Sequence, residues 1–102
     1  MNLGNLKMKL FEFFDKPEKW TKEVYAKNRY GYMVDPLSKD AVSFCMLGAL
    51  KKLGMNRASI KRHLYEIGTW LYPDKCHDYS LGMLNDRLTY EELITLLKEA
   101  NI

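Results

Sequence analysis

The sequence predicts one mainly helical domain, a small α+β fold with about four helices and one short β-hairpin, over residues 1–102. Its length of 102 residues suits a single domain. Apolar residues make up 47% of the chain, and charges of both signs are interspersed among them, as in globular rather than disordered proteins. Apolar residues also recur at helical spacing in several segments, whereas only residues 24–34 show a strand-turn-strand pattern.

The first helix is predicted to run from about Leu6 to Phe14, with Asn5 as its candidate cap. Its apolar residues fall at helical spacing: Leu6, Leu10, Phe13 and Phe14. Pro17 fits the first position of a short helical turn that reaches Trp20.

The β-hairpin is predicted where the helical spacing of apolar residues gives way to a strand-like pattern. Residues 24–27 and 32–34 flank the turn-forming segment 28–31, in which Gly31 supplies a positive φ. Pro36 then ends the second strand, because proline offers no amide hydrogen to a strand ladder.

The central helix is predicted over about Ala41–Leu53, capped by Ser38 or Asp40 and closed by Gly54. We expect the core to gather around three of its residues: Cys45, Leu47 and Leu50. In this position Cys45 is a core thiol, and its replacement by serine costs more stability than replacement by alanine, because serine buries a hydroxyl.

Two more helices are predicted in the remainder of the chain. Asn56 is the candidate cap of the first, which stops at Pro73. Its buried stripe is Ile60, Leu64, Ile67 and Leu71. Residues 74–86 show no period, so we expect an irregular stretch there. The last helix begins with a capping box made by Thr89 and Glu92. The apolar side chains that accompany the box are Leu88, Leu93, Ile94 and Leu97.

The composition argues against several classes of protein. No apolar run approaches the roughly 20 residues that a membrane-spanning helix needs. Charged residues interrupt the apolar stretch near the amino terminus, so a signal peptide is not expected. Cys45 and Cys76 are too few for a disulfide framework. We therefore expect a cytoplasmic protein without membrane contact, and no cofactor, because no ligand signature is present.

Three residues raise a cysteine hydrolase hypothesis: Cys45, His77 and Asn85. A thiolate nucleophile needs a neighbouring base and a third group that orients the base. A nucleophilic cysteine normally lies at a helix N-terminus, whereas the predicted helix places Cys45 beyond its first turn. We therefore predict no catalytic site, and the hydrolase stays an alternative.

Four side chains that can bind metals lie close together in the sequence: Asp74, Cys76, His77 and Asp78. Imidazole and thiolate groups are zinc donors. His63 is the only other histidine, so a closed tetrahedral site lacks donors. We predict a solvated loop and no metal site.

A helix-turn-helix over residues 49–64 is a further alternative. The net charge is +3, yet no acid lies between Asp40 and Glu66. Five basic side chains fall in this interval: Lys51, Lys52, Arg57, Lys61 and Arg62. The Gly-Met-Asn-Arg, Ser-Ile and Arg-His-Leu elements resemble the DNA-reading end of the bacterial factor for inversion stimulation. Nucleic acid would then be the partner of a homodimer, with Arg57 and Lys61 contacting bases or phosphates.

Tyr30, at the predicted hairpin turn, is a further candidate binding residue. Aromatic rings beside basic side chains can stack on bases or on a nucleotide ligand. The neighbouring aromatic residues Trp20, Tyr25 and Tyr32 are instead expected to pack half-buried near the hairpin.

Three sequence elements occur in a fixed order: Trp20-Thr21, Cys45-x-x-Gly48-Ala49-Leu50 and Asn85-Asp86-x-x-Thr89. With them the chain resembles, from about Phe13 to Ala100, a family of small bacterial and bacteriophage proteins catalogued as a domain of unknown function. Residues 55–81 carry little of the pattern, and Leu84 stands where relatives often have tryptophan.

The resemblance implies a bacterial or bacteriophage accessory protein and carries no known activity with it. Gly48 and Ala49 would let another element approach the central helix, while Asn85 and Asp86 would bind nearby backbone amides and prepare the Thr89 cap. Because these roles are architectural, we predict a small cytosolic non-enzymatic binding protein. Its partner would be a host protein, such as a defence component, or a small ligand.

Overall fold

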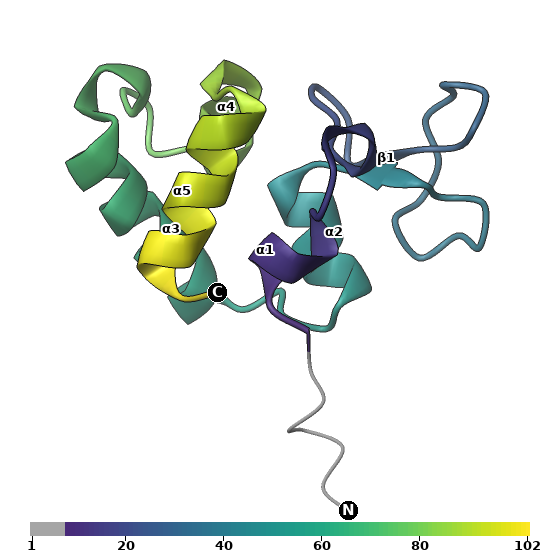
Figure 1. Cartoon of the computed structure of the whole chain (residues 1–102), viewed down its shortest axis with the longest axis horizontal. Helices are drawn as coiled ribbons and strands as arrows, with labels where there is room; N and C mark the ends of the chain where they lie inside the picture. The colour runs from purple at the N-terminus through teal and green to yellow at the C-terminus, as the bar shows by residue number, and fades with distance from the viewer. Residues whose placement is uncertain (1–7) are drawn as a thin grey trace, which may run out of the picture.

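The computed structural model describes residues 8–102 and is mainly α-helical with a small β component, as predicted (Figure 1). The α-helices are α1 (Leu10–Phe13), α2 (Met46–Lys52), α3 (Ala58–Leu71), α4 (Leu81–Arg87) and α5 (Tyr90–Ala100). Two 3₁₀ turns, η2 (Pro17–Lys19) and η3 (Pro73–Lys75), and two strands, β1 (Ala26–Lys27) and β2 (Ser43–Phe44), complete the described elements. No helix within residues 8–102 is long and apolar enough to cross a membrane.

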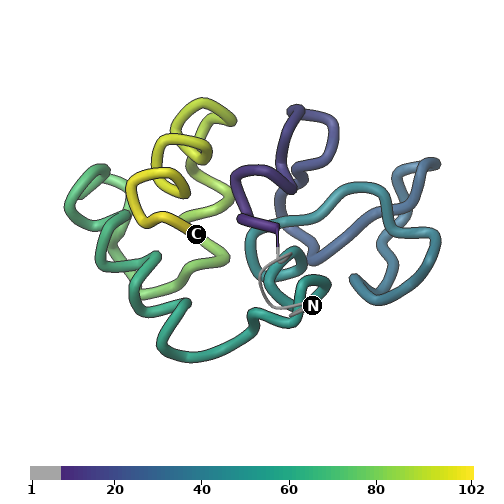
Figure 2. The backbone as a smooth tube through the Cα atoms, turned by 60° about the horizontal axis from the view of Figure 1, so that its bottom comes forward, coloured from purple at the N-terminus to yellow at the C-terminus, as the bar shows by residue number. Residues whose placement is uncertain are grey.

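The elements form two groups on either side of the core. Figures 1 and 2 show α3, α4 and α5 on one side, and α1, α2 and the strands on the other. Helix α3 packs mainly on α5, α2 packs mainly on α4, and α1 contacts both α2 and α5. The largest buried apolar side chains come from both groups: Leu10, Phe14, Met46, Leu50, Leu64, Leu84, Leu88, Leu93, Leu96 and Leu97.

The first helix is shorter than predicted. Met8 and Lys9 are described and not helical, while Asn5 and Leu6 lie outside the described residues. Helix α1 begins at Leu10 because the Glu12 carboxylate accepts a hydrogen bond from the Lys9 backbone N–H at 2.8 Å. The predicted turn at Pro17 is confirmed as η2.

The tight turn at residues 28–31 is confirmed, with Gly31 at a φ of +86° and a bridge between Lys27 and Met33. The main partner of β1, however, is β2, in antiparallel register with Ala26 opposite Phe44. This long-range pairing holds residues 43–44 extended. The predicted helix start at Ala41 is therefore wrong, and α2 begins only at Met46.

The predicted caps of the central helix instead stabilise a loop. The Ser38 hydroxyl accepts a hydrogen bond from the Asp40 N–H at 3.1 Å, within a turn before β2. Gly54 does follow the end of α2 with a positive φ of +71°, as predicted.

The C-terminal helices agree best with the sequence pattern. The Thr89 and Glu92 capping box is confirmed, with reciprocal hydrogen bonds of 3.1 and 2.9 Å. Helix α3 lies where predicted. Its N-cap, however, is Arg57 rather than Asn56, and no side chain caps the helix. Helix α4, by contrast, occupies part of the stretch predicted to be irregular. Ser80 caps it by accepting from the Met83 N–H at 3.2 Å, and its seven residues are too short to show a period.

Candidate functional site

Asn85 on α4 is a fully buried hydrogen-bonding centre. Its Oδ1 accepts from the Trp20 indole Nε1 at 2.7 Å and from the Met46 backbone N–H at 2.9 Å. Its Nδ2 donates to the Thr21 carbonyl oxygen at 3.1 Å. These partners lie between 39 and 65 residues away in the sequence. The amide therefore joins the two groups of elements, and its polar atoms have no capacity to spare for catalysis.

Asp86 makes a second connection between the groups. Its Oδ1 accepts from the Glu23 backbone N–H at 2.9 Å, where Glu23 has a positive φ of +73°. Together the two side chains hold residues 20–25 and the start of α2 against α4. The predicted role in preparing the Thr89 cap is not observed, because Thr89 bonds with Glu92 instead.

Gly48 permits the close approach that the sequence predicts. A Cβ atom at this position would lie 2.0 Å from the Tyr25 carbonyl oxygen, and that oxygen also accepts from the Cys45 N–H at 3.1 Å. The backbone of residue 25 therefore passes directly over the first turn of α2. Ala49 is fully buried beside this contact.

Cys45 is not the mid-helix residue predicted above. It is the N-cap of α2, and its Sγ accepts from the Gly48 backbone N–H at 3.3 Å. Only 5% of the residue is exposed. Burial raises the pKa of the thiol above its ordinary value, the Asp86 charge acts in the same direction, and the hydrogen bond from Gly48 opposes both. The thiol is therefore protonated at neutral pH.

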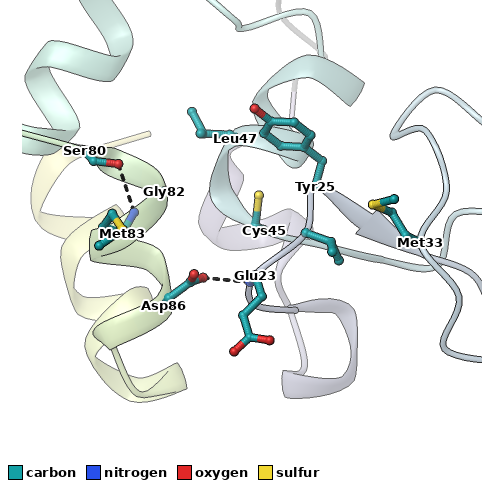
Figure 3. Close-up of a pocket in the computed structure, with 10 residues that line it drawn as sticks. Glu23, Tyr25, Met33, Cys45, Leu47, Ser80, Gly82, Met83 and Asp86 are labelled. Carbon is teal, nitrogen blue, oxygen red and sulfur yellow. Dashed lines mark hydrogen bonds between the residues drawn. The ribbon is translucent and has the colours of Figure 1, made fainter.

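A pocket of about 420 Å³ opens at the seam between the two groups, and we call it the Cys45 groove. Its lining residues are Glu23, Val24, Tyr25, Met33, Cys45, Leu47, Ser80, Gly82, Met83 and Asp86. Figure 3 shows Met83 and Asp86 on α4 facing Cys45 and Leu47 across the groove. Leu47 was expected in the centre of the core, but it is half-buried and forms part of this wall. The groove is thus mainly apolar, and we call its two acidic lining residues, Glu23 and Asp86, the rim.

The three hydrolase candidates are not assembled into a catalytic site. Cys45 and Asn85 lie on neighbouring elements, but His77 is exposed between η3 and α4 and does not line the Cys45 groove. His63 lies elsewhere, with its Nε2 3.1 Å from the Ala100 carbonyl oxygen. A protonated thiol without an imidazole beside it is a poor nucleophile.

The basic residues lie on two helices that pack on different neighbours. Lys51 and Lys52 are exposed at the end of α2, while Arg57 and Arg62 are exposed at the start of α3. In a helix-turn-helix the two helices pack on each other across a short turn. Here α2 packs mainly on α4, and α3 mainly on α5. This geometry does not favour the helix-turn-helix hypothesis.

The remaining candidates lie on the surface. Tyr30 is 72% exposed at the hairpin turn, with the Arg29 guanidinium 5.3 Å from its ring centroid. Asp78 pairs with Arg87 at 3.2 Å. In the described part of the chain, no three histidine, cysteine or acidic side chains are grouped as a metal site would require.

Comparisons with family models, with curated proteins and with solved structures return no match for this chain. The sequence elements that carry the family resemblance nevertheless meet in space around Asn85, through Trp20, the first turn of α2 and Asp86. Sequence reasoning missed Met83 and Tyr79. Both lie in the stretch read as irregular, and no periodic signal marks either of them.

Proposed function

We propose that this protein is a non-enzymatic binding protein of the bacterial cytoplasm whose Cys45 groove holds an apolar segment of a host protein. The observation that carries the proposal is an open groove with methionines on opposite walls and a capping thiol at its centre. Met33 is 71% exposed and Met83 is 45% exposed. Flexible, polarizable methionine side chains are common on surfaces that accommodate apolar partner side chains.

The charges at the rim favour a partner segment that carries a basic residue beside its apolar anchor. Glu23 and Asp86 are the charged residues among those lining the Cys45 groove, and neither has an ion pair within residues 8–102. A lysine or arginine placed at this rim would gain charge complementarity, which mainly improves specificity and the rate of association.

Two further observations support the assignment of class and compartment. Cys45 and Cys76 are both free, as is usual in a reducing compartment. The family resemblance to small bacterial and bacteriophage proteins favours a partner from the bacterial host. The hydrolase and DNA-reader alternatives receive less support, because neither a base for Cys45 nor a paired α2 and α3 is present in the described residues.

A peptide-display selection on the intact protein tests the proposal. We expect enriched peptides to combine a large apolar residue with a nearby lysine or arginine. Met83→Glu should weaken their binding about 10-fold or more, because it places a charge in the apolar wall. Met8→Glu is the matched control, since Met8 is equally exposed, at 46%, and does not line the groove.

The acidic rim is tested separately with Glu23→Gln. This variant should weaken the basic peptides several-fold and leave peptides with the basic residue replaced by glutamine unchanged. Peptides that bind wild type and Met83→Glu equally well would contradict the assignment of the groove, and a selection without enrichment would contradict the proposed function.

A further inference from the structure

A second hollow, of about 710 Å³, adjoins the Cys45 groove and shares Leu47, Ser80 and Gly82 with it, and its other lining residues come from α3 and from the chain that leads into α4. We call it the tyrosine hollow. Its polar and aromatic lining comprises Lys61, Arg62, Tyr65, Glu66, Thr69, Tyr79 and Ser80. A volume of this order is within the range of small-molecule sites.

Tyr79 is held in an unusual conformation at the edge of the tyrosine hollow. Its φ is +56°, a region that bulky residues rarely adopt, and the residue is 90% exposed. Its backbone N–H donates to the Tyr65 hydroxyl at 2.8 Å, and the two rings lie 5.9 Å apart at an interplanar angle of 34°. Burial of the ring does not compensate for this strain, and strained residues with exposed functional groups are typical of binding sites.

The charge of the tyrosine hollow is complementary to an anion. Lys61 and Arg62 line it against one acid, Glu66. The ion pairs of residues 8–102 are Lys19–Asp15, Lys75–Glu92 and Arg87–Asp78, so neither cation is paired. Lys61 and Tyr65 are four residues apart on α3, which puts an ammonium group and a ring on the same face of the helix.

We propose that the tyrosine hollow binds a planar aromatic anion of the nucleotide class. The base stacks on the exposed Tyr79 ring, and the phosphate contacts Lys61 and Arg62. Stacking on tyrosine tolerates any base, and lysine and arginine are the usual phosphate ligands. The inference goes beyond the proposed function, because the side chains that would contact the ligand, Tyr79, Lys61 and Arg62, do not line the Cys45 groove.

Calorimetric titration of the intact chain with AMP, and with uncharged adenosine, tests the phosphate contact. AMP should bind in the micromolar to millimolar range, and at least 5-fold more tightly than adenosine. The Lys61→Gln/Arg62→Gln double variant should weaken AMP about 10-fold, leave adenosine unchanged and so abolish the difference. Lys39→Gln/Lys98→Gln removes the same charge from exposed positions outside the hollow and should bind both ligands like wild type.

Substitutions of Tyr79 separate a ligand role from a structural one. Tyr79→Phe keeps the ring and should retain binding, whereas Tyr79→Gly should weaken AMP about 10-fold or more. Glycine is also expected to preserve or raise the melting temperature, because it relieves the positive φ. Wild-type affinity in Tyr79→Gly would overturn the proposal.

The source of the nucleotide is distinguished with a 5′-phosphorylated single-stranded trinucleotide. Affinity equal to that of AMP indicates a free mononucleotide, whereas tighter binding that Tyr79→Gly abolishes indicates a strand end. No detectable binding of either AMP or the trinucleotide at millimolar concentration would overturn the inference. That result would leave peptide selection on the Cys45 groove unaffected.

Discussion

The C-terminal helices and the N-terminal half of the molecule are stabilised in different ways. The caps of α4 and α5 bond to residues three positions along the chain, as Ser80 does with Met83 and Thr89 with Glu92. The caps of α1 and α2 are equally local, but two further connections of the N-terminal half run to distant residues. Trp20 and Glu23 bond to side chains of α4 that lie 65 and 63 residues away.

The two regions therefore differ in what fixes their conformation, and the candidate sites lie between them. Helices with local caps retain a preference for their conformation before the chain is compact. Residues 20–23 and the start of α2, by contrast, are also positioned by long-range hydrogen bonds to Asn85 and Asp86 of α4. Both candidate sites lie where the two groups of elements meet, and both include residues that precede or begin α4.

Gly48→Ala should produce the largest loss of stability. The added methyl would lie 2.0 Å from the Tyr25 carbonyl oxygen, so the backbone of residue 25, which accepts from the Cys45 N–H and precedes β1, would have to shift. We expect a loss of about 4 kcal/mol or more in chemical denaturation, or failure to fold. Gly82→Ala in α4 is the control, since its methyl would meet the Leu47 side chain at an ordinary 3.5 Å. A Gly48→Ala protein as stable as Gly82→Ala would refute the described approach of the two segments.

Asn85→Ala should destabilise the protein by about 3 kcal/mol. It leaves the Met46 N–H and the Trp20 Nε1–H without their acceptor in a buried site. The same variant should change the tryptophan fluorescence of the folded protein. Asn56→Ala, at an exposed position without a cap role, should stay within about 0.5 kcal/mol of wild type. Equal melting temperatures for the two variants would contradict the central role of Asn85.

Substitutions of Cys45 should have an intermediate effect on stability. Their order, with alanine more costly than serine, is the reverse of the one that the sequence predicts. As an N-cap, it should be replaced by serine at little cost, whereas alanine should cost about 1 kcal/mol because the Gly48 N–H loses its acceptor. A protonated, buried thiol should also resist alkylation at neutral pH until the protein unfolds. Greater stability of Cys45→Ala than of Cys45→Ser would restore the mid-helix interpretation. Rapid labelling of the native protein would reopen the hydrolase alternative.

The smallest effect is expected at the locally capped helix α5. The hydrogen bond from Lys75, at 2.6 Å, together with the Thr89 N–H, lowers the pKa of Glu92. A carboxylate with a lowered pKa in the folded state contributes stability above its unfolded pKa of about 4.3, and this contribution is lost as the pH falls further. At neutral pH the free energy of unfolding of wild type should exceed that of Glu92→Gln by about 1 kcal/mol at most. This difference in stability should shrink below about pH 4. Glu99→Gln is the exposed control. A difference that grows towards acid pH would contradict the ion pair.

The sequence by itself determined the features that depend on residues close together in the chain. The Thr89 capping box, the positive φ of Gly31 and the ends of α2 and α3 at Gly54 and Pro73 agree with the structure, because each reflects the chemistry of one turn. The sequence also indicated that position 48 needs a small residue, but it did not indicate that Tyr25 is the residue that approaches it.

Only the tertiary structure decided the position of Cys45 and the location of both candidate sites, whereas α4 has a local cap at Ser80 and was missed because of its length. Pairing with Ala26 keeps Phe44 extended and moves the start of α2 to follow Cys45, and Asn85 binds an amide 39 residues away. The helical spacing of apolar residues over residues 41–53 carries no information about pairing with a distant strand. Helix α4 has only seven residues, which are too few to show helical spacing. Met83 and Tyr79 acquire their surroundings from α2 and α3, so their role depends on contacts that no local pattern encodes.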